Sequence, residues 1–86
     1  MNVARLVKDN LEGFNGHASL YRCDPPHAGH EFVVASTTTA YGLMETYLFP
    51  ADSDGQIKDW LEMDGSMKET TSHDDVWANA GYQISR

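Results

Sequence analysis

Residues 20–34 read LYRCDPPHAGHEFVV, and this stretch decides the fold. Two prolines and a glycine separate two runs of apolar and β-branched residues, a pattern that predicts a β-hairpin with its turn over residues 24–29. We expect a register that places Arg22 opposite Glu31, because opposite charges then face each other across the strands. The same register pairs Cys23 with His30, Tyr21 with Phe32, and Leu20 with Val33.

The pattern continues outward from this hairpin as short runs separated by turn residues. Strands are expected over residues 14–23, 31–39, 44–51 and 56–63, and residues 82–84 could add an edge strand. The turn over Asp52–Gly55 favours a hairpin between the third and fourth of these strands.

Two helices are predicted to accompany the strands. Asn2–Glu12 is expected to be helical, since Val3, Leu6, Val7 and Leu11 fall on one helical face and Gly13 follows as a stop. A second, short helix is expected to begin after Ser72, an N-cap whose acidic partner is Asp75, and to end at Gly81. The predicted fold is therefore α+β: a four- to five-stranded antiparallel meander with both helices on one face.

Length and composition indicate a single domain over residues 1–86, without the apolar run of about 20 residues that a membrane helix requires. The one cysteine, Cys23, excludes an internal disulfide, and the N-terminus has no signal-peptide pattern, so we expect a cytoplasmic protein. The formal net charge is −7, and residues 52–75 hold eight carboxylates and two lysines. Phosphates and anionic lipids repel such a chain, which argues against direct nucleic-acid or membrane binding.

The acidic segment is the strongest functional signal. A protein with a basic surface could be steered by its carboxylates and anchored by an exposed indole. The expected contact residues are Asp52, Asp54, Asp59, Trp60, Glu62 and Asp64. This pattern favours a small interaction module, a regulator or inhibitor that occludes a basic site and, in a sharper version, mimics nucleic-acid phosphates. The alternative is that the acids only keep the domain soluble, while Trp60, Trp77 and Phe49 form its core.

A second contact is possible at the apolar loop containing Tyr41, Leu43 and Met44. Through this loop or a sheet edge the chain could instead be a homodimer or a structural component of an assembly.

A metal site is a further alternative. Cys23, His27 and His30 are zinc-capable side chains that a hairpin could bring together, although their spacing matches no standard zinc motif and His17 lies too far along the strand. No cofactor is expected.

Catalysis is not expected either. Ser72, His73, Asp74 and Asp75 carry acid and base groups, but helix capping accounts for Ser72 and Asp75. The sequence has no phosphate-cradling glycine loop and no evident oxyanion hole, so a binding protein is favoured over an enzyme.

One resemblance covers about half of the chain. The matching residues are 45–52, Gly55, Ile57, Asp59, Trp60, 64–66, Gly81 and Tyr82. In these positions the chain resembles small uncharacterised proteins of actinobacteria and their phages. The resemblance implies a phage or accessory protein that binds a host component, and it carries no activity and no functional residue.

Overall fold

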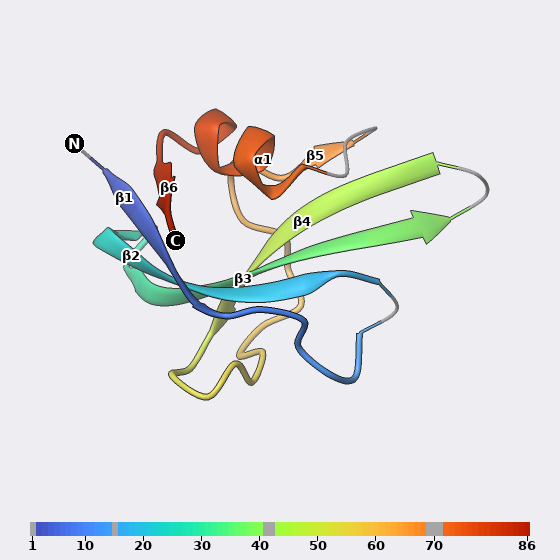
Figure 1. Cartoon of the computed structure of the whole chain (residues 1–86), viewed down its shortest axis with the longest axis horizontal. Coiled ribbons are helices and arrows are strands. Elements are labelled where there is room, and N and C mark those ends of the chain that lie inside the picture. The colour runs from blue at the N-terminus through green and yellow to red at the C-terminus, as the bar shows by residue number, and fades with distance from the viewer. Residues whose placement is uncertain (1, 15, 41–42, 69–71) are drawn as a thin grey trace.

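The computed structural model describes residues 2–14, 16–40, 43–68 and 72–86, with residues 39, 40, 43 and 68 described by their backbone only. These residues form one six-stranded sheet with a single short helix (Figure 1). The strands are β1 (Val3–Lys8), β2 (Ala18–His27), β3 (His30–Ala40), β4 (Leu43–Ala51), β5 (Met67–Lys68) and β6 (Gln83–Ser85), and the helix is α1 (His73–Asn79).

The sheet is mixed, with the order β5-β4-β3-β2-β1-β6. Neighbouring strands run antiparallel except β1 and β6, which are parallel. The chain passes from β5 at one edge to β6 at the other, and α1 spans one face of the sheet on the way (Figure 1). The predicted α+β fold, an antiparallel meander with two helices, is therefore wrong.

The N-terminal segment shows why. Residues 3–8 form a strand that pairs with β2 on one side and β6 on the other, where a helix was predicted. Ala4 and Leu6 face the core beneath α1, while Val7, needed for the helical stripe, is half exposed. A helix of eleven residues is marginal in isolation, and two flanking strands supply β1 with backbone partners that the sequence pattern does not reveal.

The central hairpin exists, but its predicted register is wrong by one residue. Arg22 pairs with Phe32, and a tight turn occupies only Ala28 and Gly29, both with positive φ. Two positive φ values are the mark of a type I′ hairpin turn, so β2 continues through the prolines, and an irregularity between Arg22 and His27 absorbs the extra residues. Arg22 and Glu31 still form the expected ion pair although they are not opposite each other, and Arg22 Nε donates to Glu31 Oε2 at 2.9 Å.

The predicted fourth strand, residues 56–63, is absent from the sheet. Ile57 makes an isolated bridge to Ala51, and the chain then follows the β4 edge through a few bonds, such as Met63 N to Leu48 O at 2.8 Å. In the sequence, the alternation of a strand would put Ile57 and Leu61 on one face and Trp60 on the other, and each face would also carry charged residues. Neither face is therefore apolar enough to be buried against the core.

The C-terminal helix begins where the sequence predicts. Ser72 is the N-cap, and its Oγ accepts from Asp75 N at 3.2 Å. Gly81 lies just past the helix with φ +89°, and the strand expected near residues 82–84 is β6. Within the described part of the chain, no helix is long and apolar enough to cross a membrane.

The two faces of the sheet are covered differently. Beneath α1, the buried Trp77 and Val76 pack on residues such as Tyr21, Val33 and Leu48. On the opposite face, Leu20 and Val34 are covered by side chains from the two loops drawn below the sheet in Figure 1, including Leu11 and Ile57. The face that α1 covers and the face that the loops cover each carry one candidate site.

Candidate functional site

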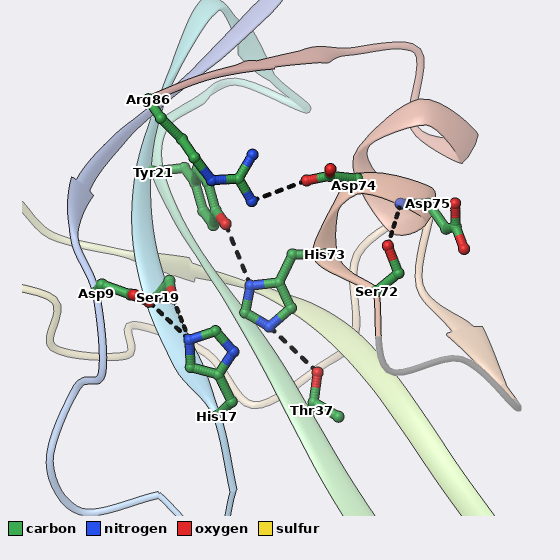
Figure 2. Close-up of polar contacts among 10 residues, drawn as sticks. All are labelled: Asp9, His17, Ser19, Tyr21, Thr37, Ser72, His73, Asp74, Asp75 and Arg86. Atoms are coloured by element: carbon green, nitrogen blue, oxygen red, sulfur yellow. Dashed lines mark hydrogen bonds and ion pairs between the residues drawn. The ribbon is translucent and has the colours of Figure 1, made fainter.

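A polar pocket lies on the helix-covered face, and we call it the histidine pocket. It has a volume of about 250 Å³ and is lined by Leu6, Asp9, His17, Tyr21, Ser72, His73, Asp74 and Arg86. Alternation along β2 and β3 points Ser19, Tyr21 and Thr37 toward α1, and His73 is the first residue of that helix (Figure 2).

His73 is the buried centre of this pocket. Its Nδ1 lies 3.2 Å from the Tyr21 hydroxyl and its Nε2 lies 3.2 Å from Thr37 Oγ1. Burial raises the pKa of Tyr21 to about 12, so the phenol is protonated at neutral pH and is able to donate to Nδ1. We assign it that role, and in the matching tautomer Nε2 carries the imidazole proton and donates to Thr37 Oγ1. Burial is the main cause of a lowered pKa of His73, and the neighbouring His17 is the second cause. The lowered pKa agrees with a neutral ring.

A second group of three side chains borders the pocket. Asp9 Oδ1 accepts from Ser19 Oγ at 2.5 Å and lies 2.6 Å from His17 Nε2. The bond from Ser19 contributes most, and the bond with His17 next, to a pKa of Asp9 that is lowered to about 2. The His17 ring stacks on His73 with centroids 4.5 Å apart and planes inclined by 9°.

The geometry of Asp9, His17 and Ser19 does not support nucleophilic catalysis. In a serine nucleophile system the carboxylate and the hydroxyl contact opposite nitrogens of the imidazole. Here both contact Nε2, with Ser19 Oγ at 3.2 Å, and Ser19 is fully buried. At the rim, Asp74 pairs with Arg86 at 2.9 Å. The charged groups of the pocket are thus paired with one another, as a structural network requires.

The side chains proposed as metal ligands have other contacts. Cys23 is buried in the core beneath α1, and burial raises the pKa of its thiol to about 12, which disfavours the thiolate that binds zinc. His27 Nε2 contacts the Asp64 carbonyl oxygen at 2.7 Å, and its ring meets Tyr82 edge to face. His30 pairs with His27 across the turn. Among the described residues there is no group of three potential ligands arranged to hold a metal ion.

The loop-covered face carries the second site, which we call the aromatic surface: Phe14, Tyr47, Phe49 and Trp60. The Trp60 ring meets Phe49 with centroids 5.2 Å apart and Phe14 at 6.2 Å, and Tyr47 lies 6.1 Å from Phe49. Trp60 nevertheless remains 66% exposed, and the adjacent Leu61 is 74% exposed. Phe14, Tyr47 and Phe49 are partly exposed, so Trp60 and Leu61 extend an apolar surface that is open to solvent, a feature found at interaction sites.

The predicted contact residues divide between turn formation and this surface. Asp52 Oδ1 accepts from the backbone of Asp54 and Gln56, and Asp59 Oδ1 accepts from Leu61 N, so both carboxylates shape their turns. Glu62 lines a groove with Tyr47, Phe49, Trp60 and Leu61. The side chains of Asp54, Asp59, Glu62 and Asp64 are exposed.

For the second predicted contact, Tyr41 lies outside the described residues, and Leu43 is described by its backbone only. Met44 is half exposed at the start of β4.

Sequence reasoning missed part of the aromatic surface. Phe14 was expected to be the first residue of a strand over residues 14–23, and it lies instead in the loop before β2. Trp60 and Trp77 were offered together as core residues, but only Trp77, on α1, is buried. The signal that could have indicated the surface is the alternation of Tyr47 and Phe49 along β4, which puts both rings on one face. No family model, curated protein or solved structure matches this chain.

Proposed function

We propose that this chain is a protein-binding module whose aromatic surface docks on a partner with a basic surface. The observation that carries the proposal is Trp60, which is 66% exposed although the rings of Phe14 and Phe49 contact it. Exposed Trp and Tyr side chains beside a groove are the residues that most often dominate protein interfaces. The docking residues are the aromatic surface with Leu61 and Glu62.

Charge supports a basic partner. Residues 52–64 carry five carboxylates and one lysine, within a chain of formal net charge −7. A long-range field of this sign speeds association with cationic surfaces and opposes association with a second copy of the chain. We therefore place a different, basic protein on the surface rather than a homodimer partner.

The role that follows is that of a regulator or inhibitor acting by occlusion. A domain of 86 residues that covers a basic site excludes other ligands from it. If the covered site binds nucleic acid, the carboxylates take the place of phosphates, and duplex DNA competes for the partner. The proposed compartment is the cytoplasm, where a single buried thiol such as Cys23 stays reduced.

Affinity capture from a host lysate, with matched variants as bait, tests the proposal. Asp54→Asn with Glu62→Gln removes two exposed charges near the aromatic surface. Asp24→Asn with Asp74→Asn removes two exposed charges elsewhere and serves as the matched control. Trp60→Ala removes the anchor.

We expect one captured protein to bind the wild type and the control equally, and to lose about tenfold or more in affinity with Trp60→Ala. Its binding is expected to weaken in the two-charge site variant and with rising salt. Equal retention by all four baits overturns the proposal. A concentration-dependent dimer that Trp60→Ala abolishes, seen by light scattering, overturns the assignment of a heterologous partner.

A further inference from the structure

The aromatic surface contains two grooves that share their walls. One groove, of about 300 Å³, is lined by all four aromatic side chains together with Gly13, Ser36 and Thr38. The other, of about 430 Å³, is lined by Tyr47, Phe49, Trp60, Leu61 and Glu62. Trp60 therefore contributes to both grooves, and Tyr47 and Phe49 line both as well.

Four separate segments build these walls. Tyr47 and Phe49 alternate along β4, and Ser36 of β3 lies directly across the ladder from Tyr47. Phe14 comes from the loop before β2, and Trp60 from the segment that follows the β4 edge. The paired strands β3 and β4 therefore form the base of the first groove, and Phe14 and Trp60, which contact each other, complete its lining from two other segments.

The rings are inclined to one another rather than stacked. The interplanar angle is 63° between Phe49 and Trp60, 50° between Phe14 and Trp60, and 42° between Tyr47 and Phe49. Inclined rings can present more than one π face to a shared space, and each face carries the negative part of the ring quadrupole. Several such faces around one groove attract a cation.

The surrounding charges have the same sign. Glu62 lines the larger groove, and Glu12 lines an adjoining groove with Phe14 and Trp60. Among the described residues, no lysine or arginine lines any of these three grooves. A cation that enters is thus not in competition with a resident cation, while an anion meets repulsion.

We propose that the groove between Phe14, Tyr47, Phe49 and Trp60 holds the guanidinium group of an arginine side chain from the partner. This inference rests on the proposed function and names the chemistry of its contact. Arginine fits better than lysine because its planar, weakly hydrated head stacks on aromatic faces. Its several N–H donors also match the acceptors nearby: the hydroxyl groups of Ser36 and Thr38 line the same groove, and the carboxylate of Glu62 lines the neighbouring one. Leu61, exposed beside Trp60, offers an apolar surface for the aliphatic stem.

The test uses a capped Gly-Arg-Gly peptide and the same peptide with citrulline, which keeps the shape of arginine and removes its charge. Binding is followed by the indole N–H signals in a two-dimensional NMR titration. The chain has two tryptophans, one exposed and one fully buried, so Trp77 is an internal reference. A third arm uses the lysine peptide.

We expect the arginine peptide to shift the Trp60 signal, to leave the Trp77 signal in place, and to bind about fivefold or more tightly than the citrulline peptide. Trp60→Leu and, separately, Tyr47→Leu are expected to remove this preference, while Val7→Ala, at a half-exposed residue that lines none of the three grooves, retains it. Unchanged signals for the rest of the sheet confirm that each variant is folded.

Equal binding of the arginine and citrulline peptides overturns the inference, and tighter binding of the lysine peptide overturns its assignment to a guanidinium. If either result accompanies a captured partner that still requires Trp60, the proposed function stands and only the arginine contact is wrong. If the arginine peptide binds as expected but every bait retains the same proteins, the groove stands and the proposed function is wrong.

Discussion

The hydrogen bond between Tyr21 and His73 is predicted to give a favourable coupling energy in the free energy of unfolding. Tyr21 Oη lies 3.2 Å from His73 Nδ1, and both residues are buried. The perturbation is a double-mutant cycle with Tyr21→Phe, His73→Leu and the double variant. Each single substitution leaves one buried polar group without its partner, whereas the double variant removes both groups.

The magnitude follows from which groups lose a partner. Tyr21→Phe leaves Nδ1 without a donor, which costs about 1–2 kcal/mol in the free energy of unfolding. His73→Leu leaves the phenol without its acceptor and costs about the same, because Thr37 Oγ1 keeps its 2.9 Å contact with Thr46 Oγ1. The double variant is expected to be less destabilised than the sum of the two by about 1–2 kcal/mol.

Urea unfolding followed by circular dichroism at neutral pH measures all four proteins. A control cycle combines Tyr21→Phe with Tyr47→Phe, whose hydroxyl belongs to the opposite face of the sheet. That control is expected to be additive within about 0.5 kcal/mol. If the cycle of Tyr21 with His73 is equally additive, the hydrogen bond contributes nothing to stability, and the neutral, Nε2-protonated state assigned to His73 loses its support.

Three further outcomes follow from the same coordinates. The pKa of His73 is lowered on folding, so the unfolded state binds the proton at a higher pH than the folded state does. The free energy of unfolding is therefore expected to fall as the pH drops below 6.5, and to fall less in His73→Leu. Urea midpoints measured between pH 5 and 8 check this. The pKa of Asp9 is lowered from 3.8 to about 2, so the stabilisation by its carboxylate is complete above pH 3.8 and is lost as the pH falls from 3.8 to about 2. Asp9→Asn is expected to lack this loss of stability in acid when urea midpoints are measured over the same range. Gly65→Ala would place a Cβ 2.5 Å from Ala80 Cβ at a φ of +104°, and is expected to lower the thermal midpoint further than Gly13→Ala, whose added Cβ meets nothing within 4 Å; equal midpoints would contradict the packing argument.

The features predicted correctly from the sequence are local ones. The start of α1 depends on Ser72 and Asp75, three residues apart, and the existence of the hairpin depends on the turn residues between two β-rich runs. Its register failed because the turn consists of Ala28 and Gly29 alone, and alanine gives no sign in the sequence that it will adopt a positive φ.

The features that could not be predicted depend on contacts between distant parts of the chain. The strand β1 is stabilised by β6, about eighty residues later, so its own helical spacing was misleading. The histidine pocket brings His17 onto His73, and no spacing rule connects residues so far apart. Of the aromatic surface, the sequence analysis named Trp60 as a contact residue but not Phe14, whose position depends on a loop between two strands.

Trp60 and Trp77 show how a thin domain uses its apolar surface. The helix α1 buries Trp77 completely, while the opposite face has only loops to cover it and leaves Trp60 66% exposed. With about 250 Å² for a tryptophan side chain and about 25 cal/mol per Å², covering that exposed part would contribute up to about 4 kcal/mol. This gain is larger than the threshold of about 2 kcal/mol for an interface hot spot, so contact between Trp60 and the proposed partner would be large enough to make this residue a hot spot.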